Sequence, residues 1–251
     1  MADPNPKVPR PKAPRPKGPQ QRASGRPSPR SIVVAFVGAA VVAAALVAGA
    51  LGLRSNSAPS AVNAPVAKLD GIPQSGRTLG QPTAKVELIE FADPQCPACR
   101  YYSLSILPTL VDEYVRTGKV RMQYHVFPFI GSDSVKAARF VLAAGLQNRL
   151  WQLHEALYRH QGAENSGWVS DELVRRLAGE IPGLDVDKLF ADAKSARIAS
   201  MLASDVAQVR ALGLGQTPSI LLRVGSRQPY LLSVPLDLGS FRRALDDALK
   251  G

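Results

Sequence analysis

The sequence predicts an α/β domain that is divided by an all-helical insertion and preceded by a single membrane-spanning helix. Three observations support this prediction. Residues 84–127 have the pattern of a strand, a helix and a second strand; residues 134–212 have helical periodicity; and residues 32–53 form an uncharged apolar run. Strand-like sequence returns after residue 212, so the helical block interrupts the α/β domain.

The formal net charge of +11 is concentrated at the N-terminus. Residues 1–30 hold eight Lys or Arg and one acidic residue, Asp3, which leaves +4 for the rest of the chain. That remainder is ordinary for a soluble domain, so the charge does not indicate a nucleic-acid partner. Residues 1–31 are rich in Pro and nearly free of large apolar side chains, and we expect a disordered tail. Such a tail is a topology signal attracted to anionic lipid headgroups; a specific cytoplasmic partner is the alternative.

The run IVVAFVGAAVVAAALVAGALGL at residues 32–53 is long enough to cross the roughly 30 Å hydrocarbon core of a bilayer as a helix. The alternative is a cleaved secretory signal, but the apolar region of such a signal spans only about 7–15 residues. Basic residues beside a span stay in the cytoplasm, so we expect a single-pass protein of the cell membrane with a cytoplasmic N-terminus. Residues 54–76, rich in Ser, Ala and Pro, then form a linker to an extracytoplasmic domain at residues 77–251.

The first predicted strand, AKVELIEFA at residues 84–92, is rich in branched and aromatic side chains. Its side chains alternate between a face with Val86, Leu88 and Glu90 and a face with Glu87, Ile89 and Phe91. Both faces are mostly apolar, as in a central strand that is covered on both sides. Residues 97–117 then read as a helix and residues 120–127 as a strand, which we expect to lie parallel to the first through a right-handed crossover.

The helical insertion, at about residues 134–212, is predicted from apolar residues that recur three or four positions apart. Two further strands are expected after it, at residues 219–224 and 230–234, with a turn between them. Residues 236–250 have the pattern of a closing amphipathic helix.

The chain has two cysteines, Cys96 and Cys99, which are too close together to join distant elements. Cys96 follows a strand and opens a helix, with Pro97 at the first helical position, where its missing N–H costs nothing. The unpaired N–H groups and the dipole of a helix N-terminus stabilise a thiolate, so Cys96 is the predicted nucleophile. Cys99 comes round to the same side of the first turn and is the predicted resolving thiol.

Other interpretations of the cysteine pair stay open. A structural disulfide across so short a loop would add little stability. A zinc site needs more ligands, and His125, His154 and His160 are scattered over other predicted elements, where we interpret them as structural. Two buried thiols could also occur by coincidence. We expect neither a metal nor a cofactor.

Four segments, in order, resemble the DsbA-like thioredoxin-fold oxidoreductases. They are LGQPTAKVELIEFADPQCPACRYY at 79–102, MQYHVFPFI at 122–130, LQNRLWQLHEALYRHQ at 146–161 and ALGLGQTPSILL at 211–222. The resemblance covers about residues 79–250. It implies a thioredoxin fold whose helical insertion lies between the second strand of the active-site βαβ unit and the cis-proline loop.

The resemblance also implies roles for individual residues. Pro218 matches the family's cis-proline, which lies against the two cysteines and presents the backbone of Thr217 to a substrate peptide. An X–Pro bond permits the cis form, although an ordinary trans turn proline is the alternative. Glu90 matches the family's buried acidic position, from which a carboxylate could exchange a proton with Cys99; a solvated strand face is the alternative.

The sequence departs from the family at two positions. Gln123 stands where the best-known members have a lysine that pairs with the buried acid, so Glu90 would lack a cationic partner. Ala98 stands where the periplasmic oxidases have a histidine that stabilises the thiolate. We therefore expect a less acidic Cys96 and a less oxidising disulfide than in those enzymes.

The function that the resemblance implies is an extracytoplasmic thiol-disulfide oxidoreductase. The leading hypothesis is an oxidase that introduces disulfides into exported proteins with reduced cysteines. A quinone-linked membrane protein, DsbB-like or vitamin-K-epoxide-reductase-like, would reoxidise it. A reductase or isomerase of the same fold is one alternative, although residues 55–76 are too short for a dimerisation domain and Gln95, not Trp, precedes Cys96. A non-catalytic, membrane-tethered peptide-binding module is the other.

Overall fold

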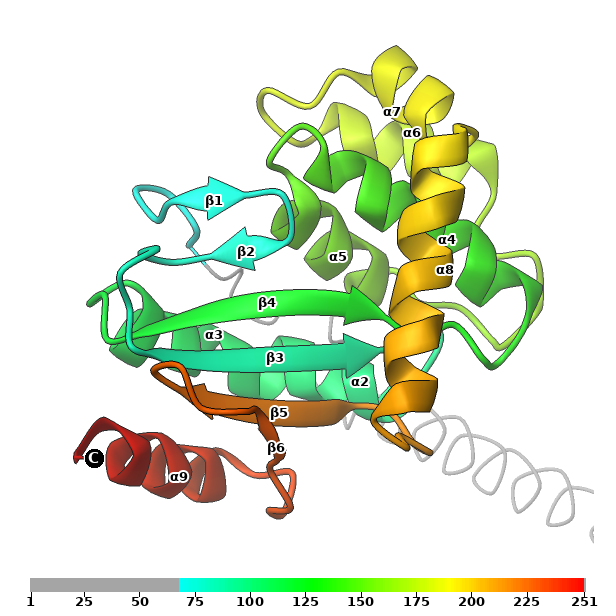
Figure 1. The fold of residues 1–251 in the computed structure, drawn as a ribbon. Helices are drawn as coiled ribbons and strands as arrows, with labels where there is room; N and C mark the ends of the chain where they lie inside the picture. The colour runs from blue at the N-terminus through cyan, green and yellow to red at the C-terminus, as the bar shows by residue number, and fades with distance from the viewer. Residues whose placement is uncertain (1–67, 251) are drawn as a thin grey trace, which may run out of the picture. The chain divides into compact units, whose positions relative to one another are not determined.

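A computed structural model describes residues 68–250 of the chain, and within them the strands form one six-stranded sheet (Figure 1). The strand order is β1-β2-β4-β3-β5-β6. β3 and β4 are parallel, and every other neighbouring pair is antiparallel. The strands are β1 (Gln74–Ser75), β2 (Thr78–Leu79), β3 (Val86–Ala92), β4 (Val120–Val126), β5 (Ser219–Val224) and β6 (Tyr230–Leu231).

Helices cover the sheet and build a separate helical layer beside it (Figure 1). One run of helix connects β3 to β4, five helices lie between β4 and β5, and one closes the described chain. The connecting run is α2 (Pro97–Tyr101), η2 (Tyr102–Ile106), α3 (Leu107–Leu110) and η3 (Val111–Val115). The others are α4 (Ser132–Gly145), α5 (Leu150–Arg159), α6 (Asp171–Gly179), α7 (Val186–Ala193), α8 (Ala196–Ala211) and α9 (Leu238–Lys250).

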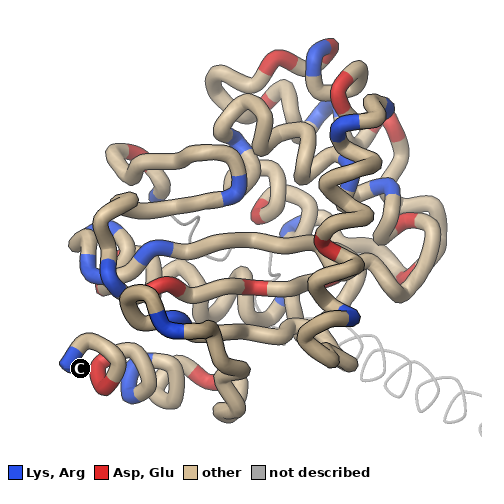
Figure 2. The backbone as a smooth tube through the Cα atoms, viewed as in Figure 1, with Lys and Arg blue, Asp and Glu red and all other residues tan. Residues whose placement is uncertain are grey.

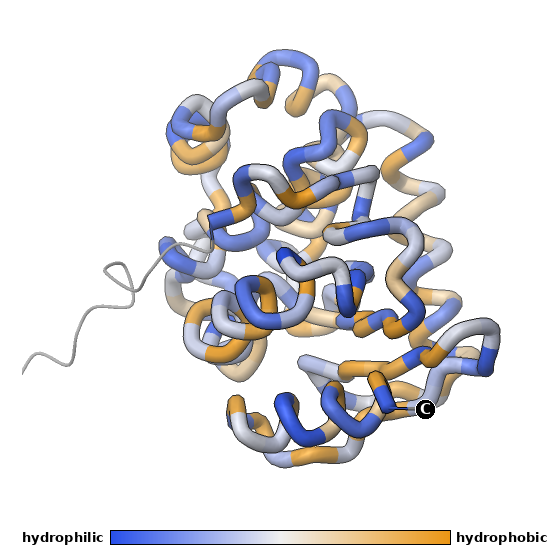
Figure 3. The backbone as a smooth tube through the Cα atoms, turned by 90° about the vertical axis from the view of Figure 1, so that its left-hand side faces the viewer, coloured by the Kyte–Doolittle hydropathy of each residue, from blue (hydrophilic) through white to orange (hydrophobic). Residues whose placement is uncertain are grey.

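β3 is the central strand, and each of its residues is buried. Val86 and Leu88 belong to the larger core, which the connecting helices and α9 share. Ile89 and Phe91 face the other way, into a smaller core that includes Val209 of α8. In Figure 3 hydrophobic positions recur along the strands and helices between hydrophilic ones. The prediction of a central strand covered on both faces is therefore confirmed.

The helix between β3 and β4 contains Pro108, which has no N–H to donate and whose ring would clash with the carbonyl one turn earlier in a regular α-helix. The chain accommodates it by winding more widely on either side, as the π-helical segments η2 and η3. The helix thereby continues to Val115, and its apolar side stays on the sheet.

The helical insertion between β4 and β5 is confirmed, and it runs from Ser132 to Ala211. Its later helices begin at side-chain caps, in which an oxygen accepts a hydrogen bond from a backbone N–H three residues on. Ser170 caps α6, Asp185 caps α7 and Ser195 caps α8. These caps explain why the insertion breaks into short helices at these points.

The structure differs from the sequence-based expectation at both ends of the sheet. β1 and β2 were not predicted; Gly76, at φ +58°, turns the chain between them, and β2 pairs with β4. Ile72 is already buried in the core, a few residues before the expected domain start at Arg77. At the other edge β6 ends at Leu231, although the Leu232 N–H still donates to the Ile220 carbonyl at 2.8 Å and Leu232 and Val234 pack on the larger core. Two-residue strands are too short to show an alternating pattern.

The predicted tail, the predicted membrane-spanning helix and most of the predicted linker lie outside the described residues. Within residues 68–250, no helix combines the length and the apolar character that crossing a bilayer requires.

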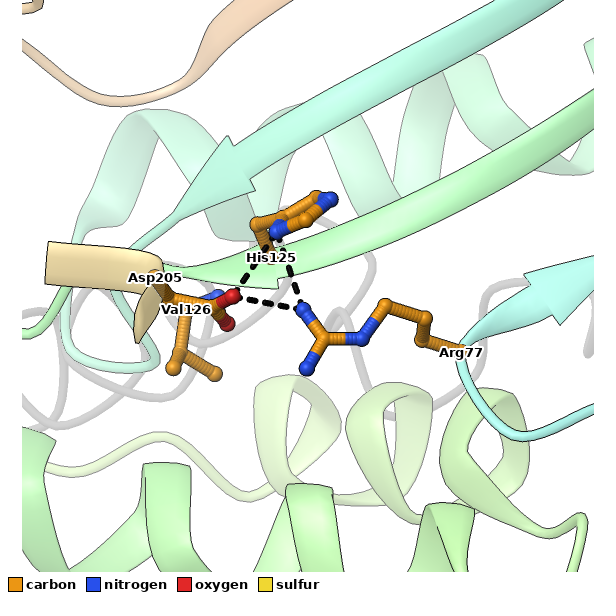
Figure 4. Close-up of polar contacts among 4 residues, drawn as sticks. All are labelled: Arg77, His125, Val126 and Asp205. Atoms are coloured by element: carbon orange, nitrogen blue, oxygen red, sulfur yellow. Dashed lines mark hydrogen bonds and ion pairs between the residues drawn. The ribbon is translucent and has the colours of Figure 1, made fainter. Parts of the chain in front are cut away.

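A buried ion-pair network attaches α8 to the sheet (Figure 4). One oxygen of Asp205 lies 2.6 Å from the Arg77 guanidinium and 2.8 Å from Nδ1 of His125, and the other accepts the N–H of Val126 at 3.0 Å. His125 also stacks on Phe91 at 4.7 Å. Burial raises the pKa of Asp205, but the hydrogen bond to His125, the charge of Arg77 and the Val126 N–H outweigh it and hold that pKa below its usual value.

Replacing Asp205 by Asn should lower the free energy of unfolding at pH 7 by about 3 kcal/mol, because Arg77 loses its buried counter-charge. The folded-state pKa of Asp205 lies below its unfolded value. Its contribution is therefore complete above about pH 4 and is lost as the pH falls through the folded-state pKa. Denaturant unfolding at a series of pH values measures both effects.

The matched control is Asp187→Asn, because Asp187 pairs with Arg175 at 3.1 Å but has a side chain that is 93% exposed. Its loss should change the free energy of unfolding by less than about 1 kcal/mol. Equal losses for the two variants would contradict the structural role assigned to Asp205.

Candidate active site

Cys96 and Cys99 lie where β3 gives way to the helix that starts at Pro97. Cys96 is the N-cap residue, with extended backbone angles, and its carbonyl accepts the N–H of Arg100 at 3.0 Å. Pro97 occupies the start of the helix, as the sequence predicts. The two thiols differ in accessibility: Cys96 is 7% exposed and Cys99 is not exposed at all. Both are free thiols in this structure.

The surroundings shift the pKa values of the two thiols in opposite directions. A hydrogen bond from Cys99, opposed by burial and aided by the backbone N–H groups of Cys99 and Ala98, lowers the pKa of Cys96 to about 6. Burial, the hydrogen bond with Cys96 and the negative charges of Cys96 and Glu90 raise the pKa of Cys99 well above its ordinary value. At neutral pH, Cys96 is therefore mainly a thiolate and Cys99 a thiol. Ala98 contributes its backbone to this balance but has no polar side chain.

Thr217 and Pro218 reach the cysteines from the loop before β5, more than a hundred residues along the chain. The Thr217–Pro218 peptide bond is cis. The carbonyl oxygen of Thr217 lies 3.4 Å from Sγ of Cys96 and accepts a hydrogen bond from that sulfur when it is protonated. The backbone at this position is thus placed beside the reactive sulfur.

The loop between β3 and Cys96 is held by the buried carboxylate of Asp93, which sequence reasoning missed. It accepts hydrogen bonds from the backbone N–H groups of Gln95, Phe129 and Ile130 at 2.8–3.0 Å. It also accepts the hydroxyl of Ser134 at 2.5 Å. A polar residue directly after an apolar strand is the signal that could have indicated this role.

Gln95, directly before Cys96, connects the same loop to the helical insertion. Its amide group donates to Ser134 at 2.9 Å and to Asn165 at 3.1 Å. Its oxygen accepts the backbone N–H of Asn165 at 2.7 Å and the indole N–H of Trp168 at 3.3 Å. The sequence context alone offered no sign of these long-range contacts.

Glu90 lies on the larger-core face of β3 and is not exposed at all. Burial raises its pKa to about 8. Glu87, the other acidic residue of β3, pairs instead with Arg121 of β4 and Arg223 of β5, and Figure 2 shows these basic positions on the neighbouring strands. In the strand register Glu90 is opposite Tyr124, whereas Gln123 is opposite Ile89 and so on the other face. Gln123 therefore does not face Glu90.

The three histidines have distinct settings. His125 belongs to the Asp205 network, and Nδ1 of His160 lies 2.9 Å from the carbonyl oxygen of Ala156 on its own helix. His154, by contrast, is buried with Nε2 at 4.0 Å from a carboxylate oxygen of Glu90. The sequence predicts a structural role for all three histidines, and this role does not account for the position of His154 beside Glu90.

The arrangement is suited to thiol-disulfide exchange. A thiolate forms readily at Cys96, which is reachable from solvent, and a buried sulfur at Cys99 can close on it. The Thr217 backbone beside Cys96 offers hydrogen-bonding groups to an approaching peptide.

Comparison with known proteins agrees with this chemistry. The profile of the family described as "Thioredoxin" matches residues 74–228. The chain is 30% identical over 177 residues to "Probable disulfide bond formation protein D" of Bacillus anthracis. The aligned region covers 69% of this chain and 78% of that protein. The oxidised crystal structure of BdbD from Bacillus subtilis superposes with a TM-score of 0.63 at 23% identity, over 75% of this chain and 97% of that one. A thioredoxin-like oxidoreductase from Silicibacter pomeroyi superposes with a TM-score of 0.53 at 28% identity, over 72% and 93%.

Alkylation of the reduced protein by iodoacetamide should have a pH midpoint of about 6, which is the pKa of Cys96. Cys99 should stay unmodified over the same range, because it is buried and its pKa is raised. Peptide mapping by mass spectrometry distinguishes the two sites.

A Cys99→Ala variant should move the Cys96 midpoint upward, because it removes the largest of the hydrogen bonds that stabilise the thiolate. A wild-type midpoint near the ordinary thiol value of about 8.5 would contradict the assignment of Cys96 as the activated sulfur.

Proposed function

Because the chain belongs to the thioredoxin family and is a protein thiol-disulfide oxidoreductase, we propose that it works as an oxidase of exported proteins. In this proposal the Cys96–Cys99 disulfide passes to pairs of reduced cysteines in client proteins. The observation that carries the proposal is the lowered pKa of Cys96, since a stabilised thiolate favours the reduced enzyme and makes its disulfide a better oxidant.

The proposed reaction has two exchange steps. A client thiolate attacks Sγ of Cys96, the more accessible sulfur; a new S–S bond forms and the electron pair of the Cys96–Cys99 bond leaves on Cys99. A second client thiolate then attacks the client sulfur of this mixed disulfide and releases Cys96 as a thiolate. The client gains one disulfide, and two electrons pass to the enzyme.

Thr217 and Pro218 would position the client during these steps. The cis-proline loop places the Thr217 backbone beside Cys96, where it can pair with an extended client strand. Pro97 and Ala98 would contribute through the helix start that holds the thiolate, and Glu90 through a proton for the buried sulfur. Because Ala98 offers no side-chain donor, we expect a milder oxidant than enzymes with a histidine there.

The proposed setting is extracytoplasmic. It is supported by the apolar run at residues 32–53 and its basic N-terminal flank, which favour a single membrane anchor with the redox domain outside. A quinone-linked membrane protein, DsbB-like or vitamin-K-epoxide-reductase-like, would remove the electrons from the reduced cysteine pair. The names of the relatives, which are disulfide bond formation proteins, agree with this direction of electron flow.

The equilibrium reduction potential of the full-length chain tests the direction. We expect a value between about −120 and −200 mV, above the glutathione poise, because the Cys96 thiolate is stabilised but Ala98 adds nothing to it. Equilibration with glutathione redox buffers, followed by tryptophan fluorescence or thiol trapping, measures it. A potential near that of thioredoxin, about −270 mV, would favour a reductase and refute the oxidase.

Trapping of clients tests catalysis itself. In cells, a Cys99→Ala variant should accumulate mixed disulfides, which form when the Cys96 thiolate attacks a client disulfide and a client thiolate leaves, and which persist because Cys99 is not there to displace the client. These adducts appear on a non-reducing gel and vanish on reduction. A Cys96→Ala, Cys99→Ala double variant is the matched control and should show none. If the single variant also shows none, the chain is a peptide-binding module and not an oxidoreductase of exported clients.

A further inference from the structure

Two buried polar side chains, Glu90 on β3 and His154 on α5, face each other in the core, where Glu90 interacts electrostatically with Cys99. Nε2 of His154 lies 4.0 Å from Oε1 of Glu90, and the two side chains are 1% and 0% exposed. Among the described residues, neither the carboxylate oxygens of Glu90 nor the ring nitrogens of His154 have a hydrogen-bond partner. Buried polar groups are nearly always paired, so the juxtaposition of two unpaired ones calls for a functional explanation.

Aromatic rings surround the His154 imidazole on its other sides. The ring centroids of Tyr124 and Tyr158 lie 4.5 and 4.8 Å away in edge-on orientations, and that of Trp151 lies 5.8 Å away. These contacts restrict the orientation of the imidazole and shield it from water. The ring is thus held with one nitrogen toward Glu90.

Burial decides which of these groups carries a proton near neutral pH. It raises the pKa of Glu90 to about 8 and lowers that of His154 to about 3, so both are mainly uncharged. The other titratable groups that interact with Glu90 are Cys99 on α2, Tyr102 on η2, Tyr124 on β4 and Tyr158 on α5, and their pKa values are all raised well above normal. Glu90 is therefore the group in this cluster that can release a proton near neutral pH.

We propose that His154 is a positioning residue of the redox site, which hydrogen-bonds the Glu90 carboxyl group and so controls proton transfer between Glu90 and the sulfur of Cys99. The separation of 4.0 Å is longer than a hydrogen bond, so the two side chains must approach each other by about 1 Å when Glu90 becomes charged. This inference rests on the proposed roles of Cys96 and Cys99.

The proton transfer accompanies the first exchange step. When a client thiolate bonds to Cys96, the Cys96–Cys99 bond breaks and its electron pair goes to Cys99. A proton from the Glu90 carboxyl group joins this sulfur, which leaves a carboxylate; neither carboxyl oxygen is hydrogen-bonded to Cys99 in this structure, so the transfer requires the two groups to approach or one water to bridge them. The N–H of the neutral His154 ring donates to that carboxylate, whose buried charge would otherwise be unfavourable. When the pair is reoxidised, the proton returns from Cys99 to Glu90.

A His154→Phe variant tests the inference, because it keeps an aromatic ring of similar size and removes the hydrogen-bonding nitrogens. Without the N–H donor, the titration midpoint of Glu90 should rise by about one pH unit. ¹³C NMR of the labelled glutamate carboxyl groups in the full-length chain measures that midpoint, and a Glu90→Gln variant assigns its signal. The His154→Phe variant should also shift the pH profile of client-thiol attack on the disulfide by about one pH unit. His154→Gln, which keeps an N–H donor, should restore much of the original profile.

A double-variant comparison separates positioning from a purely structural role. In a Glu90→Gln background, His154→Phe should leave the pH profile of the exchange rate unchanged. An equal shift in that background, or an unchanged Glu90 midpoint in the single variant, would overturn the inference. Either result leaves the proposed oxidase intact, since client trapping by Cys99→Ala does not depend on His154. Thermal unfolding should show that His154→Phe is folded, because it introduces no unpaired polar group into the pocket.

Discussion

The Asp93 carboxylate joins the loop before Cys96 to the residues that follow β4 and to the helical insertion, and the geometry of the site depends on it. It accepts the N–H groups of Phe129 and Ile130, which follow β4, and the hydroxyl of Ser134 on the first helix of the insertion. It also accepts the N–H of Gln95, one residue before Cys96. The loop that presents the reactive thiol is therefore attached to the insertion, and four donors, two of them buried, would lose their acceptor without this carboxylate.

Differences in burial explain the pKa values of Cys96, Cys99 and Glu90. Cys96 retains some exposure and gains hydrogen bonds, so its thiolate is favoured; Cys99 and Glu90 are enclosed, so their uncharged forms are favoured. The reactive sulfur is thus partly accessible, and the enclosed groups near it keep their protons. The lowered pKa of Cys96 does not need a side-chain donor at position 98, since backbone N–H groups and Cys99 supply the hydrogen bonds.

The helical insertion contributes to the site as well as covering it. It supplies Ser134, Asn165 and Trp168 to the polar network around Gln95. It also supplies His154, which faces Glu90 from α5. The sheet and the connecting helix thus provide the sulfurs and the carboxyl group, whereas the insertion provides the groups that orient the loop and close the interior.

Local sequence pattern was enough to predict the central strand, the helical insertion and the position of Cys96 at a helix start, directly before Pro97. Periodicity and capping act over a few residues, so they can be read from the chain. The two-residue strands β1 and β2, the Asp93 and Gln95 contacts, and the Glu90–His154 juxtaposition could not be read in this way. β1 and β2 are too short to show a pattern, whereas the Glu90–His154 pair and the contacts of Asp93 and Gln95 beyond their own loop join residues that are far apart in the chain. Only the packed fold brings these residues within contact distance and removes the water that otherwise sets their pKa values.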